Sequence, residues 1–223
     1  MAVKVYGVAP FAGTQVITLI LHELGIPFEL ILVDMLKLEH KKPEYIEEMH
    51  PFGQTPVFID EDGTKLFECR AVARYLAMTH GGDSLYPIKD PKKLAAFEQA
   101  ASIELTNFHP DILGLAREII YKKFAGAEPD LQRVSELKAS LEEKLLGYER
   151  ILSKSKYLAG DDITLADLFH LPYGYLLSNV LNEISFNSPK TPNLGRWWDD
   201  ITSRSSWKTV LAEGEKSPLQ LPI

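Results

Sequence analysis

The sequence predicts an α/β part followed by an all-helical part. In the first part, short apolar runs alternate with helical patterns in the order β-α-β, loop, β-β-α. In the second part, long segments with apolar residues at helical spacing follow one another, and no strand pattern recurs. The stretch between them contains glycine and proline and is typical of a linker. We therefore expect domains at residues 1–81 and 91–223, joined by a linker at 82–90.

The first part opens with a β-α-β unit. Val3–Tyr6 alternates apolar and polar residues, which predicts a short strand. Thr14–Leu24 has apolar residues at helical spacing and ends at Gly25-Ile26-Pro27, a typical helix terminator. Phe28–Val33 is a near-continuous apolar run and predicts a buried strand. Two strands joined by a helix imply a parallel pair with a right-handed crossover.

The rest of the first part contains a hairpin and two more helices. Pro56–Ile59 and Lys65–Phe67 predict strands, and Asp60–Gly63 between them has the composition of a tight turn. A helix is expected at Glu68–Thr79, and a short helical piece precedes the hairpin at Pro43–Met49.

Five helices are predicted in the second part, at 91–124, 131–152, 164–180, 191–204 and 205–213. Thr164-Leu-Ala-Asp167 has the pattern of a capping box, in which each of the two end side chains bonds to the other's backbone N–H. This role explains Asp167 without catalysis, so we assign it to folding.

The composition limits the partners and the compartment. The 223 residues are 45% hydrophobic and 25% charged, an ordinary globular profile. The net charge of −7 argues against nucleic acid or an anionic membrane as the main partner, because both attract basic surfaces. Cys69 is the only cysteine, which excludes an intramolecular disulfide and fits a reducing compartment. With no signal-peptide pattern, we expect a cytoplasmic protein without a metal ion.

Six short motifs carry a family resemblance: Val5-Tyr-Gly7, Glu39-His-Lys41, Pro51-Phe-Gly-Gln-Thr-Pro56, Phe67-Glu-Cys-Arg-Ala71, Lys156-Tyr-Leu-Ala-Gly160 and Thr164-Leu-Ala-Asp167. In their joint order and spacing the chain resembles the soluble glutathione transferases, most closely the phi class of plants and fungi, over essentially its whole length. The resemblance implies a thioredoxin-like N-terminal domain, a helical C-terminal domain and a homodimer. It also implies a detoxifying enzyme with glutathione as co-substrate, a hydrophobic electrophile as second substrate and no other cofactor.

The resemblance assigns the centre of the glutathione site to the stretch around Pro56. By itself, Pro56 is better explained by an ordinary turn before a strand. By the family pattern, a cis Pro56 holds Thr55, whose backbone N–H and C=O pair with the cysteinyl part of glutathione as one strand pairs with another. Gln54 and Glu68 are then expected near the γ-glutamyl end, with Glu68 facing the amine. Cys69 stands where the family usually has serine, and a thiol is a weaker donor than a hydroxyl.

Two basic residues match the family's partners for the glycyl carboxylate, His40 and Lys41. The alternative is that both belong to an ordinary solvated loop, and the family match favours binding. A redox role for Cys69 is a separate hypothesis, since a helix start lowers a thiol pKa. In the family's geometry, however, that position is away from the glutathione sulfur.

The sequence departs from the family at the residue that activates the thiol. Phi-class enzymes have a serine in the first loop whose hydroxyl bonds the thiolate. Alignment without a gap between Tyr6-Gly7 and His22-Glu23 puts Phe11 at that position, and tau-class spacing puts Ala9 there. Neither side chain donates a hydrogen bond.

Another group must then stabilise the thiolate, or the activity falls. Each unit of pKa lowering needs about 1.4 kcal/mol of differential stabilisation. The candidates are the backbone N–H groups of Ala12 and Gly13 at the helix start, which carry the positive end of the helix dipole. The hydroxyl of Thr14 is a third candidate, although an N-cap role explains Thr14 better.

The expected acceptor site is hydrophobic. Phe11 is expected on one side of it, with Phe108, Ile112 and Leu115 of the first long helix on the other. The last three are explained equally well by core packing.

We therefore expect a glutathione transferase that joins the glutathione thiolate to hydrophobic electrophiles, weakly if Phe11 leaves the thiol without a donor. The alternative is a ligandin, a ligand-binding protein of the same fold with little catalysis. A third possibility is an interaction module of a larger assembly, which the absence of an appended domain disfavours.

Overall fold

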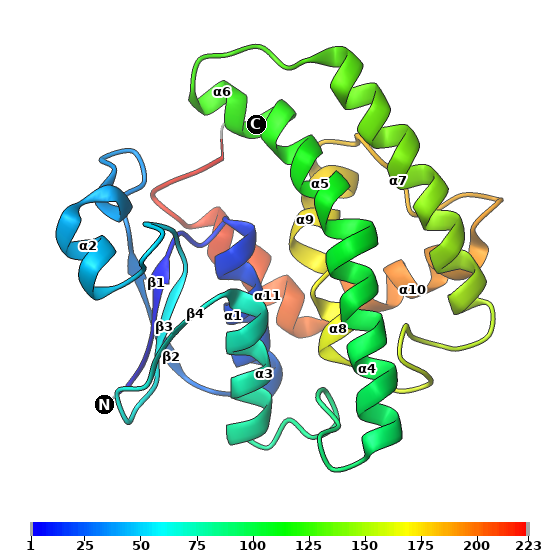
Figure 1. Cartoon of the computed structure of the whole chain (residues 1–223), viewed down its shortest axis with the longest axis horizontal. Coiled ribbons are helices and arrows are strands. Elements are labelled where there is room, and N and C mark those ends of the chain that lie inside the picture. Colours follow the sequence, from blue (N-terminus) through cyan, green and yellow to red (C-terminus); the bar gives the residue numbers. More distant parts are fainter. Residues whose placement is uncertain (1, 222–223) are drawn as a thin grey trace. The chain divides into compact units, whose positions relative to one another are not determined.

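The computed structural model describes residues 2–221, and these form two compact units (Figure 1). The first unit contains residues 2–82 together with 205–221, and the second contains residues 83–204. The division near residue 82 lies close to the expected linker. The last helix, however, belongs to the first unit and not to the expected domain of residues 91–223.

The first unit is built on a four-stranded sheet, with β1 at Val3–Gly7, β2 at Phe28–Leu32, β3 at Val57–Ile59 and β4 at Lys65–Phe67. The strand order is β2-β1-β3-β4. β1 and β2 run parallel, whereas β3 is antiparallel to both β1 and β4. The parallel pair and the hairpin predicted from the sequence are therefore both confirmed.

The helices of the first unit are α1 at Ala12–Leu24, α2 at Pro43–Glu48, α3 at Cys69–Thr79 and α11 at Ser205–Glu215, with a 3₁₀ turn, η1, at Glu39–Lys41. The C-terminal helix α11 packs on α1. His22 Nε2 lies 3.0 Å from Glu213 Oε1, and the Ser206 hydroxyl donates to Glu23. These contacts join residues more than 180 positions apart, so no local pattern could reveal them.

The second unit is all-helical, with α4 at Pro91–Ile103, η2 at Glu104–Phe108, α5 at His109–Ala116, η3 at Arg117–Tyr121, α6 at Lys122–Phe124, α7 at Leu131–Leu152, α8 at Leu165–Leu168, α9 at Leu171–Tyr175, η4 at Leu176–Val180 and α10 at Pro192–Thr202. Here η2, η3 and η4 are π-helical. The predicted helix at 91–124 is therefore a continuous helical segment in which two π-helical turns interrupt the α-helix. Pro110 lies just after the first of them, where a missing N–H and a ring clash disturb regular α-helical bonding.

The capping box predicted at Thr164 is present. Asp167 is fully buried, and burial raises the pKa of its carboxyl above the usual range, whereas the hydrogen bonds it accepts act in the opposite direction. In the expected linker, Leu85 is buried and its carbonyl accepts a 3.0 Å bond from the Leu165 N–H. This part of the linker is thus packed on the helical unit.

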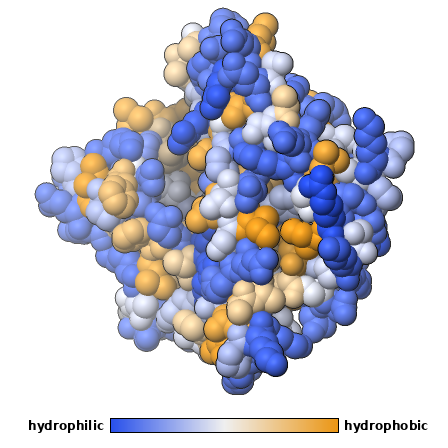
Figure 2. Space-filling view, turned by 45° about the vertical axis from the view of Figure 1, so that its right-hand side comes forward, coloured by the Kyte–Doolittle hydropathy of each residue, from blue (hydrophilic) through white to orange (hydrophobic). Residues whose placement is uncertain are grey.

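Hydrophilic residues cover most of the face in Figure 2, and apolar residues appear there in scattered groups. Within residues 2–221, no helix is both long enough and apolar enough to cross a membrane.

Candidate functional site

The start of α1 lies against the loop that precedes β3. The Thr55–Pro56 peptide bond is cis. A Cβ atom on Gly13 would lie only 2.9 Å from Pro56 Cδ and 3.7 Å from the Thr55 carbonyl oxygen. Glycine, which has no Cβ, allows this close approach of the helix backbone to the Pro56 ring. The sequence pattern leaves the role of Gly13 open, and this contact with Pro56 gives it a packing role.

The first loop places Phe11 at the N-cap of α1, in an extended conformation and without a side-chain capping bond. Thr14 is therefore not the N-cap, and that interpretation was wrong. The Thr14 side chain is fully buried, and its hydroxyl accepts a 3.2 Å hydrogen bond from the Val8 N–H. Its hydroxyl holds the loop to the helix, which is a structural role. Ala12 is also buried, and Phe11 and Gly13 are partly exposed.

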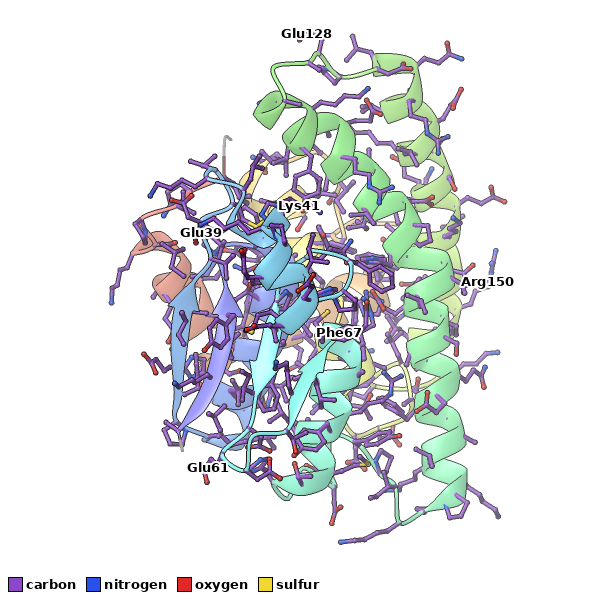
Figure 3. All side chains as sticks on the ribbon, turned by 60° about the vertical axis from the view of Figure 1, so that its left-hand side comes forward. Glu39, Lys41, Glu61, Phe67, Glu128 and Arg150 are labelled. Atoms are coloured by element: carbon purple, nitrogen blue, oxygen red, sulfur yellow. The ribbon has the colours of Figure 1, made fainter. Side chains whose placement is uncertain are left out.

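The loop that carries His40 and Lys41, here called the basic loop, is held against the loop that contains Pro56. Lys41 Nζ donates a 2.7 Å hydrogen bond to the Gly53 carbonyl. Gly53 has a positive φ of 56°, and a Cβ atom there would come within 2.7 Å of the His40 carbonyl oxygen. Figure 3 shows Glu39 and Lys41 near each other beyond one end of the sheet, on the segment that leads into α2.

His40 brings a buried polar atom to this region. The residue is 7% exposed, and its Nδ1 has no hydrogen-bond partner among the described residues. Burial lowers the pKa of His40 below its usual 6.5, and the charge of Lys41 lowers it further. The imidazole is therefore neutral at pH 7, and one ring N–H is able to donate to an anion.

A partly exposed tyrosine that the sequence pattern did not single out, Tyr45, holds the backbone carbonyl of Gln54. The Tyr45 hydroxyl donates a 2.9 Å bond to the Gln54 carbonyl, and burial raises the pKa of Tyr45 to about 12. The phenol therefore stays protonated as a donor. The signal for Tyr45 was weak, because a tyrosine in a short helical piece is more often packing.

Glu68 and Cys69 lie where β4 passes into α3. Glu68 is exposed and has φ 67°, an uncommon backbone conformation for a residue other than glycine. Backbone outliers of this kind cluster at functional sites. Cys69 is the first residue of α3 and is partly exposed. An anion at this helix start would meet backbone N–H groups and the positive end of the dipole.

The acceptor candidates of the helical unit lie in its interior. Phe108 is 1% exposed, and Ile112 and Leu115 are fully buried. The Phe108 ring packs on the rings of Tyr148 and His170, with centroids 6.3 and 4.6 Å away. Of the two explanations for these residues, their burial favours core packing.

Across residues 2–221, no three His, Cys, Asp or Glu side chains are grouped so that they could hold a metal ion.

The sheet order, the cis proline before β3 and the helical second unit define the class: a two-domain protein with a thioredoxin-like N-terminal domain. The chain belongs to the glutathione S-transferase family. Residues 1–78 match the N-terminal domain of that family and residues 108–205 match its C-terminal domain.

Known relatives are similar to this chain in sequence and structure over nearly its whole length. Glutathione S-transferase PM239X14 of Arabidopsis thaliana is 42% identical over 89% of this chain and 90% of its own. The crystal structure of glutathione transferase F2 from Populus trichocarpa has a TM-score of 0.85 at 34% identity, covering 96% of this chain and 99% of that one. Glutathione S-transferase I from maize, in complex with an atrazine glutathione conjugate, has a TM-score of 0.85 at 26% identity and covers 97% and 99%.

Proposed function

We propose that this transferase binds glutathione in its N-terminal unit and transfers the thiolate to a hydrophobic electrophile held by the helical unit. The observation that carries the proposal is the contact of the start of α1 with the cis Thr55–Pro56 loop, beside the basic loop of His40 and Lys41. The maize relative was crystallised with a glutathione conjugate, which supports the same reaction here.

Each part of glutathione has a chemical partner in the first unit. The Thr55 backbone N–H and C=O pair with the extended cysteinyl segment. His40 and Lys41 take the glycyl carboxylate at one end. At the other end, Glu68 faces the ammonium group, and the backbone at Cys69 takes the γ-glutamyl carboxylate.

Thiol activation in this proposal comes from the start of α1. Ala12 and Gly13 are the first two residues of that helix, and its first N–H groups have no partner inside the helix. Gly13 lies beside the Thr55 carbonyl, so these donors are close to the expected cysteinyl position. Donors aimed at a sulfur favour the thiolate and lower its pKa.

Calorimetry with glutathione, combined with conjugation of a halonitrobenzene, tests the function. We expect binding at millimolar glutathione or below and a measurable conjugation rate. Absence of binding at millimolar glutathione would contradict the proposal.

A second function is favoured by one observation. Phe11 occupies the N-cap of α1 and offers no hydrogen bond from its side chain to a thiolate. If the helix start alone activates poorly, the protein acts mainly as a ligandin that binds hydrophobic compounds. In either case we propose a cytoplasmic location.

We also propose a homodimer with Phe52 as an anchor. Phe52 is 67% exposed on a fixed loop, with its N–H bonded to His50 Nδ1 at 3.3 Å. Buried aromatic anchors dominate the energy of protein interfaces. Phe52→Ala should raise the dimer dissociation constant by about 30-fold or more, the equivalent of a hot spot of about 2 kcal/mol.

Analytical ultracentrifugation measures this effect. Leu131→Ala is the matched control, because Leu131 is 75% exposed but lies at the start of α7 in the other unit. A monomeric wild-type protein, or an equal effect of both substitutions, would count against the role of Phe52.

A further inference from the structure

A cavity of about 790 Å³ lies between the strand β2, the C-terminal half of α1 and the C-terminal helix α11, which packs on α1 (Figure 1). All three elements belong to the first unit. Small-molecule sites are usually pockets of about 300–1,000 Å³ with mostly apolar walls and a few polar groups. The apolar walls of this cavity come from Leu21, Ile26, Pro27, Phe28 and Leu30.

The strand β2 turns partly uncovered apolar side chains toward the cavity. It is the edge strand of the sheet, and Phe28 and Leu30 lie on the same side of it because side chains alternate along a strand. The near-continuous apolar run predicts a buried strand, but no residue of Phe28–Leu32 is buried. That prediction was wrong, because the cavity leaves this side of β2 incompletely packed.

A histidine and a glutamate form the polar wall. His22 Nε2 lies 3.0 Å from Glu213 Oε1, and the two side chains are 24% and 37% exposed. The His22 ring also packs edge-on against the Phe28 ring, with centroids 5.3 Å apart at 70°. An ionised carboxylate has no hydrogen to give, so the imidazole donates from Nε2 to Glu213. Contacts on both sides hold the imidazole, which in turn orients the carboxylate.

The carboxylate of Glu213 can accept further hydrogen bonds. An ionised carboxylate offers about four lone-pair sites. Within residues 2–221, the only hydrogen bond that this carboxylate accepts is the one from His22. Among the described residues that line the cavity, Glu213 is the only acidic one, and no lysine or arginine is present to neutralise it. The cavity therefore presents a negatively charged acceptor beside apolar walls.

We propose that this cavity binds small hydrophobic amines, with the ammonium group on Glu213 and the apolar body against β2 and α1. A hydrogen bond between an ammonium group and a carboxylate is stronger than one between neutral groups. An acid of the same shape would bring a second negative charge next to Glu213 and would be repelled. His22 is the positioning residue for the carboxylate.

The site binds its ligand and does not react with it. Among the described residues lining the cavity there is no serine, cysteine or lysine that could act as a nucleophile. None of the residues assigned to glutathione lines the cavity either, so this proposal does not rest on the transferase function. Because Glu213 is partly exposed, the ammonium hydrogens that do not bond to it can reach water.

The test is calorimetric titration of the full-length protein at pH 7 with 2-(1-naphthyl)ethylamine and with 1-naphthylacetic acid, which has the same ring and the opposite charge. Saturating S-hexylglutathione is added to block the proposed glutathione and acceptor sites. For an amine of about 13 non-hydrogen atoms we expect a Kd of about 1 mM or tighter. The acid should bind at least about tenfold more weakly.

Substitutions locate the binding. Glu213→Gln keeps the shape and removes the charge, so it should weaken amine binding by about tenfold or more and abolish the preference for amine over acid. His22→Leu should weaken amine binding by about threefold, and His22→Gln, which restores an N–H donor, should recover it. Glu215→Gln is the matched control, because Glu215 is an exposed glutamate of the same helix that does not line the cavity. It should leave the amine affinity unchanged.

Three results would overturn the proposal: no amine binding by the wild-type protein, tighter binding of the acid, or an equal effect of Glu213→Gln and Glu215→Gln. Amine binding that S-hexylglutathione abolishes would also overturn it, because the amine would then occupy the acceptor site. The comparison of amine with acid uses the wild-type protein and so does not depend on the folding of a variant. If glutathione fails to bind but the amine behaves as expected, the transferase proposal fails and this one stands.

Discussion

Replacement of Asp167 by alanine is expected to lower the free energy of unfolding by about 3–5 kcal/mol. The Asp167 side chain is fully buried and accepts four hydrogen bonds. Its Oδ1 accepts from the Leu158 N–H at 3.0 Å and from Trp197 Nε1 at 2.9 Å. Its Oδ2 accepts from the N–H and the hydroxyl of Thr164 at 2.9 and 3.0 Å. Alanine would leave these buried donors unpaired, at about 1–3 kcal/mol for each one that finds no other partner.

Urea denaturation of the purified variants measures the loss. Asp167→Asn keeps the shape and one acceptor oxygen but turns an NH₂ group toward a donor, so its stability should lie between those of wild type and alanine. Asp161→Ala is the control from the same loop, since Asp161 is exposed and accepts one long bond of 3.4 Å from the Lys156 N–H. It should change stability by less than about 0.5 kcal/mol. Equal effects at positions 161 and 167 would refute the assigned role.

The features that the sequence predicted correctly are those determined by neighbours in the chain. The β-α-β unit follows from periodicity and from the terminator at Gly25, which does adopt a left-handed conformation with φ 66°. The cap at Thr164 follows from residues only three positions apart. Both depend on backbone preferences and hydrogen bonds that operate locally.

The features that the sequence missed depend on distant partners. The packing of α11 on α1 uses His22 and Glu213, 191 positions apart. Helical periodicity predicts that residues 91–124 are helical but does not distinguish α from π turns, because one extra residue shifts the pattern only slightly.

The predictions for the candidate site also divide into local features, which were correct, and features that depend on distant partners, which were missed. The motif around Pro56 predicted the cis bond through the family resemblance, and the Thr55–Pro56 bond is cis. Tyr45 and the packing role of Gly53 were missed, since each acts through a loop brought close only by folding. The N-cap role was assigned to Thr14 because threonine favours that position. In the structure the helix starts earlier, at Ala12, and the Thr14 hydroxyl accepts a hydrogen bond from the Val8 N–H.

Substitution of Phe11 by serine is expected to raise kcat/KM for glutathione conjugation by about tenfold at a pH below the thiol pKa. One hydroxyl donor that lowers this pKa by one unit supplies about 1.4 kcal/mol and raises the thiolate fraction about tenfold. The backbone at Phe11 is already suitable, because its φ of −87° and ψ of 131° are the extended values that an N-cap serine adopts. The substitution should therefore not disturb the start of α1.

The pH profile of the reaction separates a new donor from other effects. In Phe11→Ser, the apparent pKa of the bound thiol should fall by about one unit relative to wild type, and the gain in rate should disappear at high pH. Ultraviolet absorbance of the bound thiolate gives the same pKa without an acceptor. Phe11→Ala is the matched control, since it removes the same ring without adding a hydroxyl.

The alanine control also decides between the two proposed functions. If serine lowers the thiol pKa and alanine does not, the wild-type helix start activates glutathione incompletely, and Phe11 favours ligand binding over turnover. If wild type already shows a depressed thiol pKa that serine does not lower further, the N–H groups at Ala12 and Gly13 supply the missing donor. The second result would make the protein an efficient transferase despite the lost hydroxyl, because helix N–H groups are fixed in place before the thiolate forms.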